Sequence, residues 1–426
     1  MYPQTYYAQT RSDLAARPAL HGAVDTDTVI VGAGLAGLTT ALELAREGVA
    51  VTVLETECIG FGASGRNGGI VSPAFACGSD AIEARVGPEK ARALHRLTIE
   101  GVQRLRGHIQ TLNIPQAEPV AGLLNLRRFD QAQDLRAYAQ DFERDYDYTF
   151  TYLDRPTIQE RLQTTRYLHG LEDAQAFHIH PLNYLRALAA EVERLGGKIY
   201  EHSPATGCAL GPQKRLRTPN GQVTAKRAIF ATGGYTGPLI PRLKRAVLPI
   251  ATYMMVSKPA PDLLAKVIKT PSAVLDDRRA SDYYRLVEGG QRLLWGGRIT
   301  TRAASPQAVA ADLRRAMLDV YPQLAPLETD LAWSGLMGYA RHLMPQIGQL
   351  QPDVWHITAF GGHGLNTTAI AGKVLAEAIL GQSNRIDLFA PWGLTYAGGP
   401  IGLAIAQLTY WSLQAQDHWR ERRRLT

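Results

Sequence analysis

The chain has 426 residues, of which 45% are hydrophobic and 20% charged, which is the composition of a globular protein with room for two domains. Its net charge of +7 is spread along the chain except at the C-terminus, so a solvated surface is favoured and no nucleic-acid partner is expected. The cysteines Cys58, Cys77 and Cys208 form no CxxC pair, which argues against a disulfide framework and a cysteine metal site and fits a reducing cytoplasm. No apolar signal-peptide core and no run of about 18 apolar residues is present, so neither a signal peptide nor a membrane span is expected.

Residues 27–55 predict a strand, a tight turn, a helix and a second strand. Gly32, Gly34 and Gly37 form GxGxxG directly after a short apolar strand. There they permit a tight turn, the approach of a pyrophosphate and close packing of the helix. Glu55 ends the second strand and is placed to accept hydrogen bonds from a ribose hydroxyl. The whole unit therefore predicts dinucleotide binding.

Residues 60–73, GFGASGRNGGIVSP, predict a glycine-rich loop rather than a regular element. Ser64 and Arg66 place a hydroxyl and a guanidinium beside free backbone N–H groups, which suits contacts to phosphate, ribityl or flavin-ring atoms. A glycine loop without a ligand is the alternative interpretation of this stretch taken alone.

The strand–helix alternation then stops, and an inserted domain is predicted. Its expected elements are a helix over 87–112, a strand over 122–127 and helices over 131–144 and 156–162. A strand over 174–180 follows and leads into a helix that begins at Pro181 and runs to Leu195. His178 and His180 form an HxH pair. No carboxylate or cysteine cluster joins it, so a structural or helix-capping role is favoured and no metal is expected.

The nucleotide-binding unit resumes with strands over 198–202 and 225–231. The second of these ends in Thr232-Gly233-Gly234, which places glycine backbone at the carboxyl edge of the sheet, where open α/β folds bind cofactors. Alternating and aromatic strands then predict an antiparallel sheet. The expected elements are strands over 249–257, 282–287 and 292–299, a helix over 307–321 and a strand over 331–337.

A strand over 354–359 leads into a glycine-rich segment, 360–368, and a helix over 369–380. The partial positive charge at the start of that helix suits the negative charge at the N1/C2 carbonyl edge of a reduced flavin. Residues 401–419 predict an amphipathic helix, followed by a basic run at 420–424. A packing helix with a solvated tail is favoured, and weak contact with anionic lipid is the alternative.

GxGxxG followed by an acid serves NAD and FAD equally, and the other glycine-rich segments favour FAD. Loops at 62–69, at 232–234 and at Gly361 are expected to return to one ligand, whereas a nicotinamide dehydrogenase needs its fingerprint once and a separate catalytic domain. No second strand–GxGxxG–helix unit is present, which argues against enzymes in which NAD(P)H reduces the flavin. The electrons are therefore expected to come directly from the substrate.

Several motifs in this order resemble the D-amino-acid oxidase superfamily, which includes glycine and sarcosine oxidases. The bacterial γ-glutamylputrescine oxidases and related amine oxidases are the most similar group. The likeness covers the chain from about Tyr6 onward and is carried by DTVIVGAGLAGLTTALELA, GASGRNGG, HIHPLNY, ATGGYTG, DYYRL, RLLWGGR, FGGHGLNTT and AGKVLAEAI. It implies FAD, a two-domain interleaved fold, and oxidation of an amine C–N bond to an imine that hydrolyses.

The resemblance also implies roles for individual residues. Gly32, Gly34, Gly37 and Glu55 would hold the ADP part, and Gly233 would support the nucleotide. Ser64, Arg66, Asn67 and Gly68 would line the phosphate and the isoalloxazine. The segment of Gly362, His363, Gly364, Leu365 and Asn366 would face the flavin pyrimidine edge.

The chain departs from the sarcosine oxidases at two places. Those enzymes attach flavin through a cysteine in the loop that here reads Ala340-Arg341-His342-Leu343-Met344, which has no cysteine, so a noncovalent FAD is expected, with a histidyl link at His342 as the exception. They also place a lysine near the flavin to promote oxygen reduction, where this chain has Leu293-Leu294-Trp295. Fast reaction with oxygen is therefore not implied.

The substrate is expected to meet Tyr253, Tyr284, Arg285 and His342, with Trp333 and Trp295 as walls, although each aromatic residue on a strand is also a core candidate. For an amino-acid substrate, one arginine should bind the carboxylate bidentately, and the contenders are Arg285, Arg298 and Arg341.

The predicted fold is α/β plus α+β, with a Rossmann-type FAD-binding domain interleaved with an antiparallel-sheet substrate domain. The predicted divisions are an N-terminal arm (1–25), a FAD-binding domain (26–86, 175–245 and 331–382), a substrate-binding domain (87–174 and 246–330) and a C-terminal helix with a basic tail (383–426).

Three functions are compatible with this predicted fold. The first is a cytoplasmic oxidase of a polyamine derivative or a small or cyclic amino acid that passes electrons to oxygen and gives hydrogen peroxide. The second is a dehydrogenase, peripheral on the inner membrane face, that passes electrons from pipecolate or a D-amino acid to quinone. The third is a flavin-binding module without catalysis.

Overall fold

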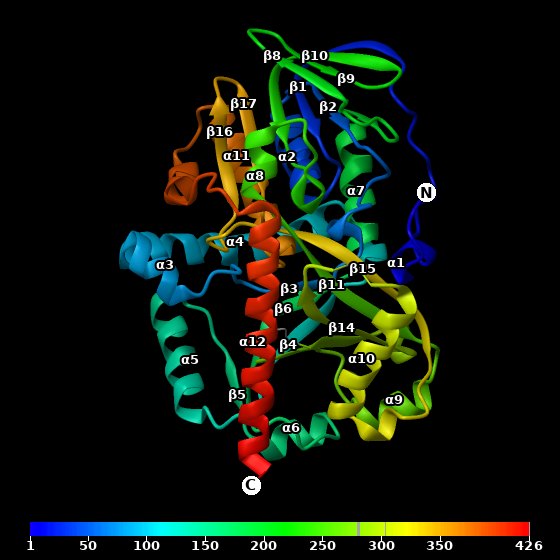
Figure 1. The fold of residues 1–426 in the computed structure, drawn as a ribbon, viewed down its shortest axis with the longest axis vertical. Coiled ribbons are helices and arrows are strands. Elements are labelled where there is room, and N and C mark those ends of the chain that lie inside the picture. The colour runs from blue at the N-terminus through cyan, green and yellow to red at the C-terminus, as the bar shows by residue number, and fades with distance from the viewer. Residues whose placement is uncertain (279–281, 303, 426) are drawn as a thin grey trace.

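Two β-sheets, each covered by helices, make up the computed structural model of the chain, which describes residues 1–278, 282–302 and 304–425. In Figure 1 the sheet that contains β1 lies in the upper part of the molecule and the sheet that contains β4 and β14 lies below it. The predicted combination of a Rossmann-type unit and a largely antiparallel sheet is confirmed.

The first sheet has eight strands in the order β16-β17-β10-β1-β2-β7, with a β8-β9 hairpin beside β10. The strands are β1 (Gly22–Val31), β2 (Val51–Leu54), β7 (Lys198–Tyr200), β8 (Gly207–Leu210), β9 (Lys214–Arg217), β10 (Gly221–Phe230), β16 (Gln346–Gln351) and β17 (Val354–Thr358). β1 pairs in parallel with β10 on one side and with β2 on the other. Every residue of β2 is buried, as expected for a parallel strand covered on both faces.

The two faces of this sheet belong to different apolar cores. Ile30 of β1 faces a large core that includes α2 (Leu35–Arg46), α7 (Pro181–Arg194) and α11 (Gly364–Ile379). Val29 and Val31, on either side of it, lie in a core with the β8-β9 hairpin and α8 (Pro241–Ala246). This alternation fixes the orientation of β1, because successive side chains of a strand point to opposite faces.

The second sheet has nine strands in the order β15-β11-β14-β13-β12-β4-β6-β3, with β5 beside β6. Its neighbouring strands are antiparallel except β12 and β4. The strands are β3 (Ile70–Val71), β4 (Val120–Arg127), β5 (Thr151–Leu153), β6 (His169–His178), β11 (Leu248–Ser257), β12 (Ala273–Asp276), β13 (Tyr283–Val287), β14 (Arg292–Thr300) and β15 (Thr329–Tyr339). One face packs on α6 (Arg155–Arg161), α9 (Pro261–Val267) and α10 (Pro306–Val320) around a core that includes Tyr284 and Trp295.

Five further helices complete the described part of the fold. They are α1 (Tyr6–Gln9), α3 (Ser79–Val86), α4 (Pro88–Thr111), α5 (Ala132–Tyr146) and α12 (Gly399–Leu425). α12 runs down the lower half of the molecule (Figure 1), against β11 and β14. The predicted basic run at 420–424 falls mostly outside the residues whose side chains are described. Over the described residues, no helix combines the length and the apolarity that crossing a bilayer requires.

Some predicted boundaries differ from the elements. The strand predicted over 331–337 is β15, which lies in the antiparallel second sheet as expected, so the domain boundary that assigned residues 331–382 to the FAD-binding domain divides that sheet. The boundary at residue 174 falls inside β6, and the boundary at residue 25 falls inside β1. α4 packs on α11 in the core of the first sheet, although the sequence placed it in the inserted domain. Short apolar strands look alike in both sheets, and only the pairing partner distinguishes them.

Candidate functional site

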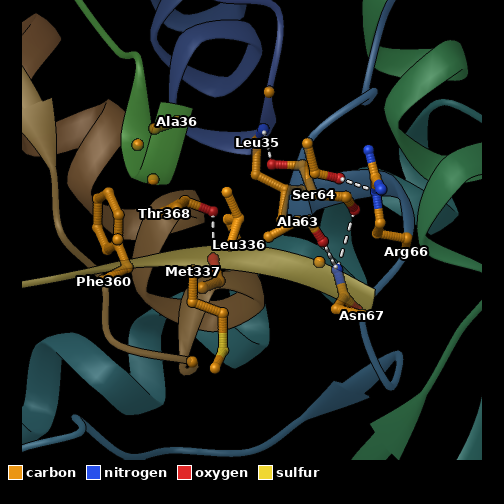
Figure 2. A pocket seen from close by; sticks show the side chains of 18 of the residues that line it. Leu35, Ala36, Ala63, Ser64, Arg66, Asn67, Leu336, Met337, Phe360 and Thr368 are labelled. Atoms are coloured by element: carbon orange, nitrogen blue, oxygen red, sulfur yellow. Dashed lines mark hydrogen bonds between the residues drawn. The ribbon is translucent and has the colours of Figure 1, made fainter. Parts of the chain in front are cut away.

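A cavity of about 520 Å³ lies where loops of the first sheet meet the second sheet. Figure 2 shows Leu35 at the start of α2, Ser64 and Asn67 of the glycine-rich loop, and Met337 of β15 around this space. Its wall comprises residues 31, 32, 34–36, 55–57, 231–235, 335–339 and 357–366, most of residues 60–72, and Thr252, Leu275, Tyr283, Arg298, Ile299 and Thr368. The four predicted glycine-rich segments therefore do meet at one cavity.

The GxGxxG turn between β1 and α2 has no room for a side chain at its glycines. A Cβ on Gly37 would lie 1.9 Å from the carbonyl oxygen of Gly32, and Gly32 itself has φ +106°. A Cβ on Gly34 would lie 2.8 Å from Ser64 Oγ, and that Oγ accepts a hydrogen bond from Leu35 N at 3.0 Å. Ser64 therefore joins the second glycine-rich loop to the start of α2.

Glu55 lies at the end of β2, as predicted, and its carboxylate holds the turn. Oε2 accepts a hydrogen bond from Ala33 N at 2.8 Å and Oε1 accepts one from Glu57 N at 3.0 Å. Burial raises the pKa of Glu55, and the two backbone hydrogen bonds oppose that rise. The predicted contact of Glu55 with a ribose stays a prediction.

Arg66 and Asn67 fasten the 60–72 loop. The guanidinium of Arg66 donates from Nε to Phe61 O at 2.8 Å and from Nη1 to Ser334 O of β15 at 3.1 Å, which links the loop to the second sheet. It forms no ion pair with a carboxylate of the described residues, and burial lowers its pKa. Asn67 donates to Ser64 O at 2.9 Å and accepts from Gly69 N at 2.8 Å. The loop thus holds a half-buried positive charge on the cavity wall.

The last two glycine-rich segments also present backbone to the cavity. Gly233 has φ +53°, and Gly361 and Gly362 have φ +61° and +86°. α11 begins at Gly364, five residues earlier than predicted. Because its first residues lie on the cavity wall, the unpaired N–H groups of its first turn are at the cavity. His363 Nδ1 is buried and makes no hydrogen bond to a described residue, while burial lowers the pKa of His363. The side chain of Asn366 points elsewhere, with Nδ2 3.5 Å from both Ala74 O and Thr98 O, so only its backbone is available here.

These features fit an FAD. The turns that carry the glycines leave room for phosphates, and a helix N-terminus and the half-buried Arg66 supply positive potential. The buried Nδ1 of His363 has no hydrogen-bond partner among the described residues. Among residues 1–278, 282–302 and 304–425, no group of His, Cys, Asp and Glu side chains is arranged to hold a metal ion.

Tyr284 is not a cavity residue, contrary to the prediction. Its ring stacks on Trp295 with centroids 4.3 Å apart, and its hydroxyl lies 2.8 Å from the hydroxyl of Tyr321 inside the core of the second sheet. The neighbouring Tyr283 faces the cavity instead, and its hydroxyl lies 3.3 Å from Thr252 Oγ1. The sequence DYYRL gives two adjacent aromatic residues, and it does not reveal which one of them faces inward.

Arg285 is buried outside the cavity wall and acts on other residues of the site. Nε donates to Gly68 O at 2.9 Å, and Nη2 donates to Ile179 O at 2.7 Å and to Tyr7 Oη at 3.1 Å. Nη1 lies 3.0 Å from His178 Nδ1. Its donors are therefore occupied, and it fixes the glycine-rich loop against β6 and the N-terminal arm rather than binding a carboxylate.

Of the three arginine contenders, only Arg298 lies on the cavity wall. Arg341 is exposed on its loop. His342, in the same loop, accepts a hydrogen bond from Met344 N at 3.2 Å and lies outside the wall. The hydroxyl of Tyr253 donates to Arg302 O at 2.9 Å, and the residue lines a neighbouring cavity.

The two tryptophans do not form cavity walls. Trp295 is fully buried in the core of the second sheet. Trp333 donates from Nε1 to Arg66 O at 3.0 Å and so supports the loop from behind. Residues that do face the cavity from the second sheet, and that the sequence did not single out as pocket residues, include Thr252, Leu275, Tyr283, Ile299, Leu336, Met337 and Tyr339. Every second side chain of a strand points to the same face of the sheet, so these residues could have been predicted only if it had been known which face each residue occupies.

His180 caps α7, as the sequence favoured. Its Nδ1 accepts a hydrogen bond from Asn183 N at 3.1 Å, and its Nε2 lies 3.0 Å from Thr10 Oγ1 of the N-terminal arm. Tyr7 of the same arm packs edge-on against the His180 ring. The HxH pair therefore holds the arm and the loop in place.

Comparison with known proteins gives a consistent result. The model of the family described as FAD dependent oxidoreductase matches residues 27–378. The chain is 33% identical over 391 residues to the gamma-glutamylputrescine oxidoreductase of Escherichia coli K12, covering 91% of this chain and 92% of that protein. It is 32% identical over 403 residues to the probable oxidoreductase OrdL of Haemophilus influenzae, covering 91% and 90%. The crystal structure of glycine oxidase from Geobacillus kaustophilus shares the fold, with a TM-score of 0.71, 18% identity and coverage of 87% of this chain and 99% of that one.

Proposed function

The chain belongs to the family of FAD dependent oxidoreductases, and we propose that it oxidises the C–N bond of an amine or amino acid to an imine, which water then hydrolyses. The proposed substrate class is a polyamine derivative similar to γ-glutamylputrescine, and small or cyclic amino acids are the alternatives. The similarity to an oxidoreductase of γ-glutamylputrescine over nearly the whole of both chains supports this choice.

The charge on the cavity wall is the observation that carries the proposal. The carboxylates on the wall belong to Glu55 and Glu57, at the nucleotide-binding turn. Beside the second sheet the wall has the guanidinium of Arg298 and no carboxylate of a described residue. Since Arg298 is paired with Asp312, desolvation is the deciding effect: a wall without a described carboxylate beside the second sheet offers an ammonium ion no counter-charge, and this favours the neutral amine that oxidation requires.

Bound FAD supplies the acceptor for the two electrons that leave the amine. The chain contributes orientation and exclusion of water. Burial raises the pKa of Tyr283 to about 12, so its hydroxyl stays protonated and available as a hydrogen-bond donor. The ring of Tyr283 lies against Gly68, where a Cβ would meet it at 2.7 Å, so it connects the cofactor loop to the substrate side.

We further propose that the FAD is noncovalent and that oxygen is the electron acceptor, giving hydrogen peroxide. The positions of His342 and of the loop around it, outside the cavity wall, support the first statement. No lysine is present on the described cavity wall, so oxygen would be reduced without the help of a nearby ammonium group.

A second candidate is a membrane-associated dehydrogenase that passes electrons to quinone. It is favoured by a stripe of apolar side chains along one side of α12, formed by Ile401, Ile405, Leu408 and Trp419, which are 72%, 59%, 61% and 56% exposed. The basic run at 420–424 follows this stripe in the sequence, and such a combination binds anionic lipid surfaces.

Anaerobic mixing of the yellow protein with amines and with D- and L-amino acids tests the proposal. We expect γ-glutamylputrescine to bleach the flavin absorbance and, in air, to yield one hydrogen peroxide per turnover. Turnover that needs a quinone analogue and gives no peroxide would select the second candidate. If no compound of either class bleaches the flavin, amine oxidation is wrong for this chain.

A further inference from the structure

A second cavity, of about 410 Å³, adjoins the cofactor cavity. It is lined by residues of β11, β14, α10 and α12 and by Arg278, which follows β12. Arg298 and Ile299 line both cavities, so the two spaces meet at this point of β14.

Arg298 is held at the junction in an unusual conformation. Its φ is +65°, in the left-handed region that residues with side chains rarely adopt and that is often found at functional sites. Its guanidinium donates from Nε to Asp312 Oδ2 at 2.9 Å and from Nη2 to Asp312 Oδ1 at 3.3 Å. Nη1 makes no hydrogen bond within the described residues, so a donor is left at the junction.

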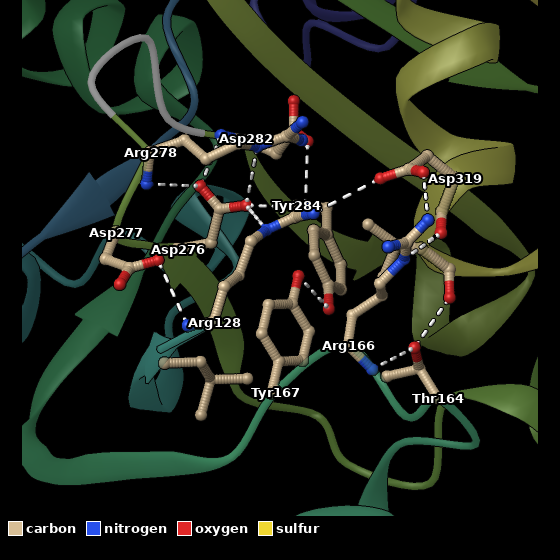
Figure 3. A network of polar contacts seen from close by, with 12 residues as sticks. Arg128, Thr164, Arg166, Tyr167, Asp276, Asp277, Arg278, Asp282, Tyr284 and Asp319 are labelled. Carbon is tan, nitrogen blue, oxygen red and sulfur yellow. Dashed lines mark hydrogen bonds and ion pairs between the residues drawn. The ribbon is translucent and has the colours of Figure 1, made fainter. Parts of the chain in front are cut away.

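Arg278, another residue of the wall of the second cavity, is held by buried carboxylates. Its Nε lies 3.3 Å from Asp276 Oδ2, and its Nη2 pairs with Asp282, whose side chain is fully buried. Figure 3 shows Arg128 reaching the same carboxylate, and its Nε lies 2.9 Å from Asp276 Oδ2. This network fixes the direction of the Arg278 guanidinium before any ligand binds, which reduces the entropy cost of binding.

α12 closes the second cavity with polar groups. Gln407 Oε1 accepts hydrogen bonds from Thr300 Oγ1, Thr301 N and Thr301 Oγ1 at 2.9, 2.9 and 3.0 Å, which orients its amide N–H₂ as the remaining donor. Asp312 and Asp417 contribute carboxylates to the wall. The second cavity therefore presents guanidinium and amide donors together with carboxylates.

We propose that the second cavity binds the α-amino-acid head group of a long amine substrate whose reacting amine lies in the cofactor cavity. The head group carries a carboxylate, which suits Arg278, and an ammonium, which suits Asp312. The chain that joins the two ends passes Arg298 and Ile299, where Arg298 Nη1 can donate to an amide carbonyl. The inference rests on the proposed amine oxidation and assigns a specificity site to it.

Binding of two unreactive probes tests the proposal without turnover. The first probe is γ-glutamyl-n-pentylamide, in which a methyl group replaces the reacting amine. The second is the matching glutaryl amide, which lacks the α-ammonium. We expect calorimetry on the FAD-loaded wild type to give at least tenfold tighter binding of the first probe. Replacing Asp312 in Asp312→Asn should reduce this preference to less than threefold, because the ammonium then loses its carboxylate.

Trp411→Ala serves as the second variant, because the indole lines the second cavity from α12. We expect it to weaken the γ-glutamyl probe at least fivefold, whereas Gln416→Ala, on an exposed position of the same helix, should change its affinity less than twofold. Equal binding of the two probes by the wild type, no binding of either, or an unchanged preference in Asp312→Asn would each overturn the subsite. If the probes behave as expected and no amine bleaches the flavin, the subsite stands and the proposed oxidation fails.

Discussion

The cofactor end and the substrate end of the main cavity are built in different ways. At the cofactor end, glycines of four loops present backbone, and a side chain at Gly32, Gly34 or Gly37 would collide with a neighbour. At the substrate end, side chains of strands β11, β13 and β14 form the wall, and the neighbouring side chains on those strands are core. The cofactor end therefore depends on which residue type stands at a position. The substrate end depends on which face of the sheet each strand residue occupies.

The largest effect is expected where the cofactor end is disturbed. A Cβ on Gly37 would lie 1.9 Å from Gly32 O, so we expect Gly37→Ala to destabilise the protein by about 3 kcal/mol and to abolish FAD binding. The ratio of flavin to protein absorbance and the unfolding midpoint measure this.

Gly107→Ala is the matched control, because nothing lies within 4 Å of the added Cβ and Gly107 is inside α4. It should leave FAD bound and stabilise the chain by about 0.5–1 kcal/mol. Normal flavin content in Gly37→Ala would show that the glycines are not needed at the cofactor end.

The same difference explains what the sequence could predict. GxGxxG, the 60–73 loop and the segment before α11 are recognisable because only glycine suits a positive φ or a close approach, and each lies on the cavity wall. Most of the longer strands of both sheets were also expected, because apolar alternation marks them, whereas β3, β5, β8, β9, β12 and β16 were not predicted.

The substrate residues were harder to predict, and the reason is physical. Tyr283 and Tyr284 are adjacent, and a shift of one residue exchanges the cavity face for the core face. Arg285 offers a guanidinium like that of Arg298, but its donors are satisfied by Gly68, Ile179 and other groups far away in the sequence. Partners that lie far away in the sequence cannot be recognised before the fold is known. Residue type alone therefore could not show that Arg298 lines the cavity and Arg285 does not.

The histidines behind the glycine-rich loop should make the cofactor end sensitive to acid. Arg285 donates to His178 Nδ1, so Nε2 carries the hydrogen and donates to Pro271 O, and the ring is neutral. Burial lowers the pKa of His178 to about 3, and that of His180 likewise to about 3. Below the ordinary histidine pKa of about 6.5, the unfolded chain binds protons that the folded chain does not.

The free energy of unfolding therefore carries no penalty from these two histidines above about pH 6.5, and it decreases as the pH falls from there towards 3. When the pH is lowered from 7.5 to 5, each of the two histidines should lower the free energy of unfolding by about 2 kcal/mol. His178→Asn should remove about half of the combined loss in urea titrations at the two pH values, and His21→Asn, at an exposed position, should remove none. Equal losses in the wild type and in His178→Asn would contradict this.

Replacing the two adjacent tyrosines sharpens the contrast at the substrate end. Tyr284→Phe leaves Tyr321 without a hydroxyl partner in the core, so we expect a loss of about 1 kcal/mol in stability with an unchanged kcat/KM. Tyr283→Phe should lower kcat/KM about tenfold, or about 1.4 kcal/mol, with little change in stability. If Tyr284→Phe is the variant that loses activity, the strand phase inferred for β13 is wrong.

The smallest effect is expected at His342, which the sequence offered as the exceptional site of a covalent link. His342 lies outside the cavity wall, and its contacts are a hydrogen bond from Met344 N at 3.2 Å and a long one of 3.4 Å to Gly393 O. Its replacement in His342→Ala should therefore change stability by no more than about 0.5 kcal/mol and leave the flavin content as in the wild type. The proposed noncovalent binding predicts that acid precipitation releases the flavin into the supernatant from both proteins, because it requires no bond to this ring. A yellow pellet from the wild type that turns colourless in His342→Ala would instead place a covalent link at this residue.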